Sequence, residues 1–326
     1  MFDWMNRNTY QLLAPNIGFA RHEVIGGIRR FHLAAEVVEQ ELVKGVKIRA
    51  LGYNASTPGP VLVFYEGERV QIVLHNRLSE PTSIHWHGLI VPDNMDGVPG
   101  IGAGPIVKPG ESFVYDFVVR QSGTYMYHAH ANDPLEELMG LVGMIVVLPR
   151  ERTRDHVDRD YCMLLQEWSV ATGSMKQGQD TMKMDQMQMG MNRSGGMGSG
   201  SGEIQNINPM SMDFNYFTMN GKSFPDINPI LVRYGERIRI RLANLSMNSH
   251  PMHLHGHYFQ ATATDGSLLP APFFKNTINV APGETWDIEF VANNPGTWAF
   301  HCHKPHHMTN EHQSKMGGMF TIVKYE

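Results

Sequence analysis

The chain has 326 residues, of which 42% are hydrophobic and 18% charged, and a formal net charge of -5, an ordinary composition for a globular protein. Basic and acidic residues are interspersed without a basic patch, which excludes nucleic acid as a partner. No apolar run reaches the roughly 18 to 20 residues of a membrane helix, and two cysteines are too few for a disulfide framework.

The N-terminal segment, Met1 to Glu23, lacks the charged start, apolar core and small-residue cleavage site of a secretory signal. We therefore expect either a cytoplasmic protein or one whose signal is not part of this sequence.

Short apolar and β-branched runs follow in each half of the chain, bounded by Gly, Pro and Asn. They are Val61 to Tyr65, Val70 to Leu74, Phe113 to Val119, Met144 to Leu148, Ile230 to Val232, Ile238 to Leu242, Trp286 to Val291 and Met319 to Val323. Such runs predict an all-β protein built of β-sandwiches. Short helical pieces are expected near Pro134 to Met139 and Pro305 to Asn310.

Between the halves lies a polar segment with ten methionines from Met175 to Met219. It has too few branched and aromatic residues to form a core, so we expect a mobile loop. This predicts a first domain over 1–170, a Met/Gly/Ser-rich segment over 171–204 and a second domain over 205–326.

Four His-X-His pairs occur as two matched sets, one in each half. They are His85 and His87, His128 and His130, His253 and His255, and His301 and His303. Gly67-Glu68-Arg69 precedes the first pair, and Gly235-Glu236-Arg237 the third, at one shared spacing. Pro109-Gly110-Glu111 and Pro282-Gly283-Glu284 likewise precede the second and fourth pairs. The two domains are therefore predicted to arise from an internal duplication.

The histidine pairs suit metal binding, because residues i and i+2 of a strand point to the same face about 6.6 to 6.8 Å apart. Four converging pairs would supply too many nitrogen ligands for one ion and would suit a cluster of about three, and imidazole binds copper, zinc and iron.

Only the fourth pair encloses a cysteine, and strand alternation sends the Cys302 thiolate to the face opposite the two imidazoles. With His250, His307 and a weak thioether, it would complete a blue-copper ligand set. At the corresponding positions the first half has Thr82, Ala129 and Pro134, so the first domain is predicted to lack a mononuclear site.

The axial thioether is assigned to Met316. Aligning Gly318-Met319 with Gly143-Met144 places Met316 opposite Leu141. Met308 and His312 remain alternatives.

These motifs resemble the copper signatures of the multicopper oxidases, in particular the two-domain, laccase-like type. They are His85-Trp86-His87-Gly88, Tyr127-His128-Ala129-His130, the run from His250 to His257, and His301-Cys302-His303 with His307. The resemblance implies two cupredoxin-like domains and four coppers per functional unit. It implies a type 1 copper on His250, Cys302, His307 and Met316. It implies a type 2 copper on His85 and His253. It implies a type 3 pair on His87, His128, His130, His255, His301 and His303. Asp96 would deliver protons.

The resemblance also implies a homotrimer, in which each cluster lies between the first domain of one subunit and the second domain of its neighbour, since such head-to-tail contacts must close into a ring. It suggests a secreted, periplasmic or cell-surface protein if a signal was removed. The match departs at two points: the interval from His307 to Met316 is longer than usual, and Met308 stands where some relatives carry an acidic residue.

The predicted function is that of a laccase-like oxidase. Phenols or aromatic amines would give single electrons at an exposed edge of His307, and dioxygen would be reduced to water at the cluster. The methionines suggest an alternative, a cuprous oxidase in copper tolerance, because thioethers favour Cu(I). A non-catalytic copper-binding protein is disfavoured, because storage needs no cysteine between cluster ligands. A copper nitrite reductase is disfavoured because that family carries its type 1 cysteine in the first domain.

Overall fold

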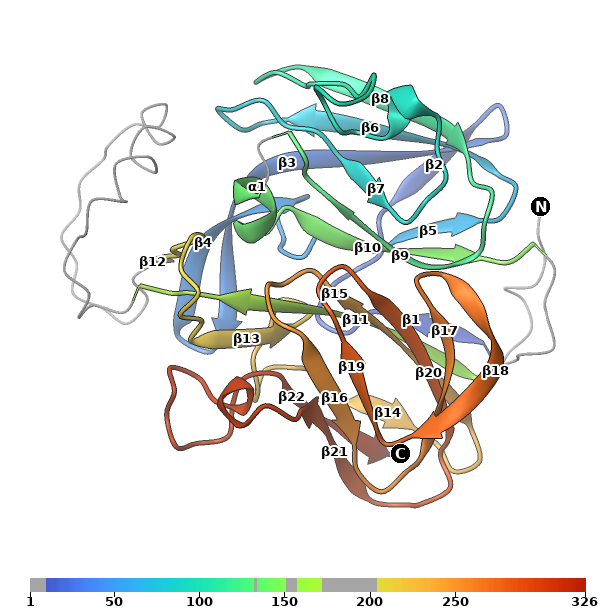
Figure 1. Cartoon of the computed structure of the whole chain (residues 1–326), viewed down its shortest axis with the longest axis vertical. Coiled ribbons are helices and arrows are strands. Elements are labelled where there is room, and N and C mark those ends of the chain that lie inside the picture. Colours follow the sequence, from blue (N-terminus) through green and yellow to red (C-terminus); the bar gives the residue numbers. More distant parts are fainter. Residues whose placement is uncertain (1–9, 132–133, 151–156, 172–203) are drawn as a thin grey trace.

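The computed structural model describes residues 10–131, 134–150, 157–171 and 204–326. Within them the chain is nearly all strand, which confirms the expected fold class. The short helical pieces are α1 (Leu135–Leu138), η2 (Asp93–Met95) and η3 (Pro305–Met308). In the described residues no helix is both long and apolar enough to cross a membrane. Figure 1 shows two sandwiches, one above the other.

The first sandwich packs a large sheet on a small one around a core that contains Phe31, Ile72 and Trp86. The large sheet contains β2 (His22–Ile25), β3 (Ile28–Val43), β4 (Val46–Tyr53), β6 (Arg69–Asn76), β8 (Ser112–Val118) and β12 (Ile204–Asn206). The small sheet contains β5 (Leu62–Tyr65), β7 (His85–His87), β9 (Gly123–His128) and β10 (Val142–Leu148). Alternate residues of β6 are buried, as one core-facing side requires.

The second sandwich has the same plan, with a core that contains Ile240, Phe259 and Cys302. Its large sheet contains β1 (Gln11–Leu13), β11 (Arg159–Trp168), β13 (Tyr216–Met219), β15 (Arg237–Asn244), β17 (Phe259–Thr264), β18 (Ser267–Lys275) and β20 (Thr285–Val291). Its small sheet contains β14 (Ile230–Val232), β16 (His250–Leu254), β19 (Thr277–Val280), β21 (Thr297–Cys302) and β22 (Phe320–Tyr325).

The duplication is visible in the pairing of the small sheets. The order β5-β10-β9-β7 in the first is matched by β14-β22-β21-β16 in the second. His85 lies opposite His128, and His253 lies opposite His301. Each sandwich therefore brings its two histidine pairs together on two neighbouring strands of its small sheet, β7 and β9 in the first and β16 and β21 in the second.

The expected boundary at residue 170 does not match the sheets. β11 pairs in parallel with β15, so it belongs to the second sandwich, together with β1. All ten residues of β11 are buried, and such a strand is stable only inside a sheet with both faces covered. β12 then returns to the first sandwich and pairs with β4. The Met/Gly/Ser-rich segment lies outside the described residues except at its two ends.

Candidate metal centres

Three buried side chains of the second sandwich meet in a group that could hold one metal ion: His250, Cys302 and His307. The two Nδ1 atoms lie 3.1 Å apart, and the Cys302 Sγ lies 3.7 Å from His250 Nδ1 and 3.6 Å from His307 Nδ1. Metal-nitrogen bonds of about 2.0 Å and metal-sulfur bonds of about 2.3 Å give ligand separations of roughly 3.1 to 3.7 Å when the bond angles lie between about 100° and 120°. The set therefore fits copper without rearrangement.

The three residues of this group come from three different elements of the fold. His250 begins β16, Cys302 ends β21, and His307 lies in η3, where Phe217 stacks on its ring at 4.0 Å between centroids. Burial lowers the pKa of His250 to about 3 and that of His307 to about 2, so both imidazoles are neutral and able to bind metal. Burial raises the pKa of the Cys302 thiol to about 12, so the metal must displace its proton.

The expected exposed edge of His307 is absent, because this residue is only 1% exposed. Phe217 covers one face of the His307 ring. The Nε2 of His307 faces the buried carboxylate of Glu167. The adjacent His306 is exposed and packs edge-on against His307 at 4.5 Å between centroids. The sequence could not show this, because the covering groups come from other strands.

The candidates for the axial thioether differ in burial. Met316 is 59% exposed, whereas Met319 is fully buried in the same core cluster as Cys302. The amide of Met319 donates to the carbonyl of His307 at 2.8 Å, and its carbonyl accepts from the amide of Cys302 at 3.0 Å. Of the two alternatives, Met308 is half-buried and His312 is exposed. The signal for Met319 was its place in the apolar C-terminal run.

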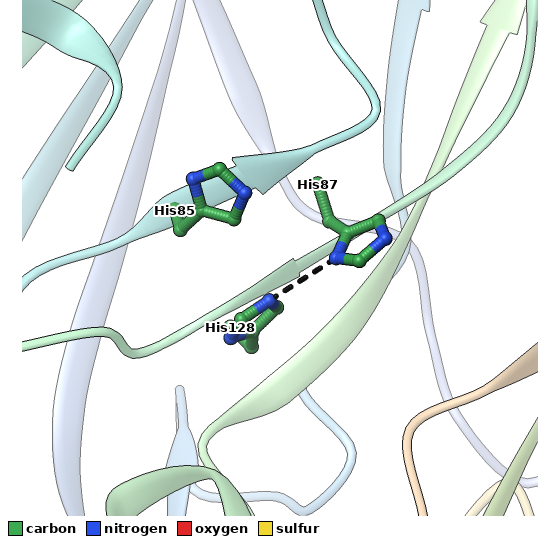
Figure 2. Close-up of side chains that lie close together, drawn as sticks. All are labelled: His85, His87 and His128. Atoms are coloured by element: carbon green, nitrogen blue, oxygen red, sulfur yellow. Dashed lines mark hydrogen bonds between the residues drawn. The ribbon is translucent and has the colours of Figure 1, made fainter. Parts of the chain in front are cut away.

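The first sandwich presents a second group, in which nitrogen atoms of His85, His87 and His128 lie within 4.8 Å of one another. Figure 2 shows the two residues of β7 beside His128 at the end of β9. The Nδ1 of His87 lies 3.4 Å from the Nε2 of His128. His130 packs against His85 at 5.4 Å between ring centroids. The structure thus brings together all four first-domain histidines that the sequence predicted.

Backbone carbonyls orient these rings. The Nδ1 of His85 donates to the carbonyl of Asp96 at 2.9 Å, and that of His128 donates to the carbonyl of Ala129 at 3.0 Å. The Nε2 atoms are therefore free for metal. The Asp96 carboxylate lies 3.4 Å from His85 Nδ1 and is 39% exposed. A second carboxylate, that of Glu137, was not predicted from the sequence and lies 3.2 Å from His128 Nδ1.

The second sandwich forms the matching group from His253, His255, His301 and His303. The Nε2 atoms of His255 and His301 lie 3.0 Å apart, and the ring of His253 lies 5.5 Å from that of His303. The Nδ1 of His253 donates to the carbonyl of Asn276 at 2.7 Å, which again leaves Nε2 free. His255 and His303 are exposed.

The two histidine groups remain separate within one chain. Among the described residues, the four histidines of the first sandwich contact one another through their rings, and so do the four of the second sandwich. In this described part of the chain, no ring contact joins a histidine of one group to a histidine of the other. His253 and His255 instead line an open cleft of about 680 Å³, whose other described walls come from the same sandwich, including Tyr258 and Phe274.

Comparisons with known proteins agree with this geometry. Family models described as multicopper oxidase match residues 35–152 and 200–316. Copper resistance protein A of Escherichia coli is 32% identical over 266 residues, which cover 76% of this chain and 43% of that protein. The chain thus spans less than half the length of this relative.

Two solved structures are similar over nearly all of this chain. The blue copper oxidase from Nitrosomonas europaea is 30% identical with a TM-score of 0.75, covering 91% of this chain and 86% of that one. The multicopper oxidase mgLAC is 29% identical with a TM-score of 0.74, covering 92% and 86%. The paired histidines, the buried thiol between two of them and these matches together assign the chain to the multicopper oxidase family.

Proposed function

We propose that the chain is a laccase-like oxidase, which takes single electrons at the mononuclear site and reduces dioxygen to water at a three-copper cluster. The observation that carries the proposal is the position of Cys302. Its thiol faces His250 and His307. Its sequence neighbours His301 and His303 belong to the four-histidine group of the second sandwich. Copper would supply the one-electron chemistry and the dioxygen reduction; the strand end at Cys302 links the two sites covalently.

In this proposal four coppers are held by the chain's own residues. The type 1 copper would bind His250, Cys302 and His307, with Met319 in place of the expected Met316 as the axial thioether. The type 2 copper would bind His85 and His253. The type 3 pair would bind His87, His128, His130, His255, His301 and His303. Asp96, which is partly exposed and lies beside His85, would carry protons from solvent, and Glu137 offers a second route beside His128.

The separation of the two histidine groups supports a shared cluster. The first sandwich of a neighbouring subunit would enter the cleft lined by His253 and His255, and repeated head-to-tail contacts would close into a homotrimer. We expect light scattering of the copper-loaded protein to give three times the chain mass, and activity to fall when dilution dissociates it. A copper-loaded monomer with full activity would contradict this assembly.

The electron donor has two candidates. Phenols and aromatic amines give single electrons readily, but the burial of His307 means that they would not touch this imidazole directly. Cu(I) is the second candidate, because exposed thioethers of Met210, Met212 and Met316 are soft ligands, and the relatives that are similar to this chain include proteins named for copper resistance. Such a cuprous oxidase would act in copper tolerance.

Dioxygen uptake by the copper-loaded protein tests the proposal, with a simple phenol and with stabilised Cu(I) as donors. The same assay after deletion of residues 182–197, which lie outside the described residues, separates the two donors. Loss of Cu(I) turnover alone would assign those methionines to copper handling, and survival of both activities would leave the laccase-like function. Failure of the loaded protein to consume dioxygen with either donor would favour a non-catalytic copper-binding protein.

A further inference from the structure

A buried carboxylate lies on the side of the mononuclear site that faces away from Cys302. Glu167 projects from β11, and its side chain is 1% exposed. Its Oε1 lies 3.6 Å from the Nε2 of His250 and 3.8 Å from the Nε2 of His307. The sequence offered one signal for this residue, a glutamate near the end of a strand whose middle, Tyr161 to Leu165, is apolar.

The two oxygens of Glu167 have different surroundings. Oε2 accepts from the backbone and side-chain nitrogens of Asn248 at 3.1 and 3.2 Å. Asn248 in turn accepts from the Lys304 ammonium at 3.4 Å. Oε1 is buried without a hydrogen-bond partner among the described residues. A buried carboxylate oxygen without a donor is costly, and the nearest potential donors are the two imidazole Nε2 atoms.

The imidazoles need such an acceptor if they bind a metal through Nδ1. A neutral imidazole carries one N–H, and the partner of one nitrogen decides which nitrogen is protonated. Both Nδ1 atoms face the Cys302 thiol, so their lone pairs must be free and Nε2 must carry the hydrogen. For His250 the nearer partner of Nε2 is the hydroxyl of Ser246 at 2.8 Å. For His307 the carboxylate of Glu167 lies 3.8 Å from Nε2, just beyond hydrogen-bonding distance.

We propose that Glu167 is a positioning residue of the mononuclear site, which holds the His307 ring with Nε2 protonated and Nδ1 turned toward Cys302, and which also places a carboxylate beside both imidazoles. This inference rests on the type 1 copper site proposed above. Partners of this kind fix the orientation of metal-binding histidines and tune the metal. Burial has the largest effect on the pKa of Glu167 and raises it, although the Asn248 hydrogen bonds and the Lys304 charge act in the opposite direction.

A negative charge near the copper stabilises the oxidised site, which carries more positive charge than the reduced one. Removal of that charge should therefore raise the reduction potential without removing any ligand. Glu167→Gln tests this, because it keeps the shape and one acceptor oxygen. Glu167→Leu also removes the acceptor and should broaden or weaken the blue absorption band, because the His307 ring is no longer fixed.

The experiment measures the visible spectrum, the electron paramagnetic resonance spectrum and the type 1 reduction potential of the copper-loaded full chain. The control is Glu289→Gln, a buried carboxylate of the same sandwich that contacts Arg237 and Arg239 instead of an imidazole. It should lower thermal stability and leave the potential unchanged.

We expect a higher potential with a retained blue band in Glu167→Gln, and a perturbed band in Glu167→Leu. If both variants kept the wild-type potential and spectra, Glu167 would be a packing residue and the inference would be overturned. Should Glu167→Leu fail to fold, the potential of Glu167→Gln decides. Absence of a blue band from the wild-type protein would instead contradict the proposed function itself.

Discussion

At the scale of single residues, the neighbouring side chains give two equally buried cysteines different chemistry. Cys162 and Cys302 are both fully buried, and burial raises the thiol pKa of each. Two imidazole nitrogens lie within 3.7 Å of the Cys302 sulfur, whereas the Cys162 side chain packs in an apolar cluster with Val142 and Leu164. Only Cys302 can therefore exchange its proton for a metal bond.

Replacement of that thiol should separate the two kinds of metal site. We expect Cys302→Ser to abolish the blue absorption band and the oxidase turnover, because a hydroxyl does not replace a thiolate as a soft copper ligand. The histidine groups should still bind copper, which metal analysis would show. Cys162→Ser is the matched control and should keep the band. A blue band in Cys302→Ser would refute the ligand assignment.

Matched substitutions can compare Met316 and Met319, the two candidates for the axial thioether. Met319→Leu should keep the blue colour and raise the reduction potential, because an axial thioether donor is lost. Met316→Leu should change neither, because Met316 is exposed. Voltammetry of the two variants measures the difference. A shift caused by Met316→Leu and not by Met319→Leu would restore the assignment made from sequence.

At the scale of elements, the turn between η3 and β22 holds His307 against the end of β21. Gly318 has a φ of +61°, and a Cβ at this position would overlap the carbonyl of His307. The same carbonyl accepts from the amide of Met319. The C-terminal strand and the histidine ligand are therefore fixed by one compact turn, which only glycine fits without displacement.

A methyl group at this turn should displace His307. We expect Gly318→Ala to lower stability and to reduce copper occupancy of the mononuclear site, as measured by the blue band per copper bound. The control is Gly110→Ala, where φ is +78° and a Cβ would meet open space. That control should cost only about 1 to 2 kcal/mol of backbone strain and should leave the blue band intact. Equal blue bands in the two variants would contradict the displacement.

At the scale of the whole molecule, a buried charge network joins the two sandwiches. Arg241 on β15 contacts Asp160 at 2.8 Å and Asp287 at 3.2 Å. It also donates to the Thr124 hydroxyl of the first sandwich at 2.7 Å, and Thr124 donates to Asp287 at 2.6 Å. Burial by itself would raise the pKa of Asp160, but Arg241 and Arg239 outweigh it and lower that pKa.

Loss of the Asp160 charge should destabilise the two sandwiches together. Asp160→Asn leaves Arg241 with Asp287 as the remaining carboxylate partner named above, and breaking a buried pair costs about 3 kcal/mol or more. Because the folded-state pKa of Asp160 is lowered, its contribution is fully present above the ordinary Asp value of 3.8 and is lost as pH falls through the lowered value. The stability difference from wild type, measured by denaturant unfolding, should therefore shrink in acid.

An exposed pair provides the control for this network. Arg69 and Asp116 form a two-pronged ion pair on the surface of the first sandwich. Asp116→Asn should change stability far less, because solvent already screens that pair. Equal losses in the two variants would mean that burial adds nothing to the Asp160 network.

The sequence by itself determined the features that depend on local periodicity. Alternation along a strand puts the two histidines of each pair on one face and Cys302 on the other, whatever the rest of the chain does. The Gly-Glu-Arg and Pro-Gly-Glu motifs precede the histidine pairs at the same spacings in both halves, and these equal spacings reveal the duplication. These local rules were enough to predict the all-β class and the three residues that meet in the mononuclear group.

Only the tertiary structure decided what surrounds those ligands. β11 joins the second sandwich through long-range pairing, and it brings Glu167 to the far side of His250 and His307. The turn at Gly318 buries Met319 and leaves Met316 in solvent. Such contacts join residues far apart in the chain and depend on how strands and loops pack, and no spacing in the sequence records that packing.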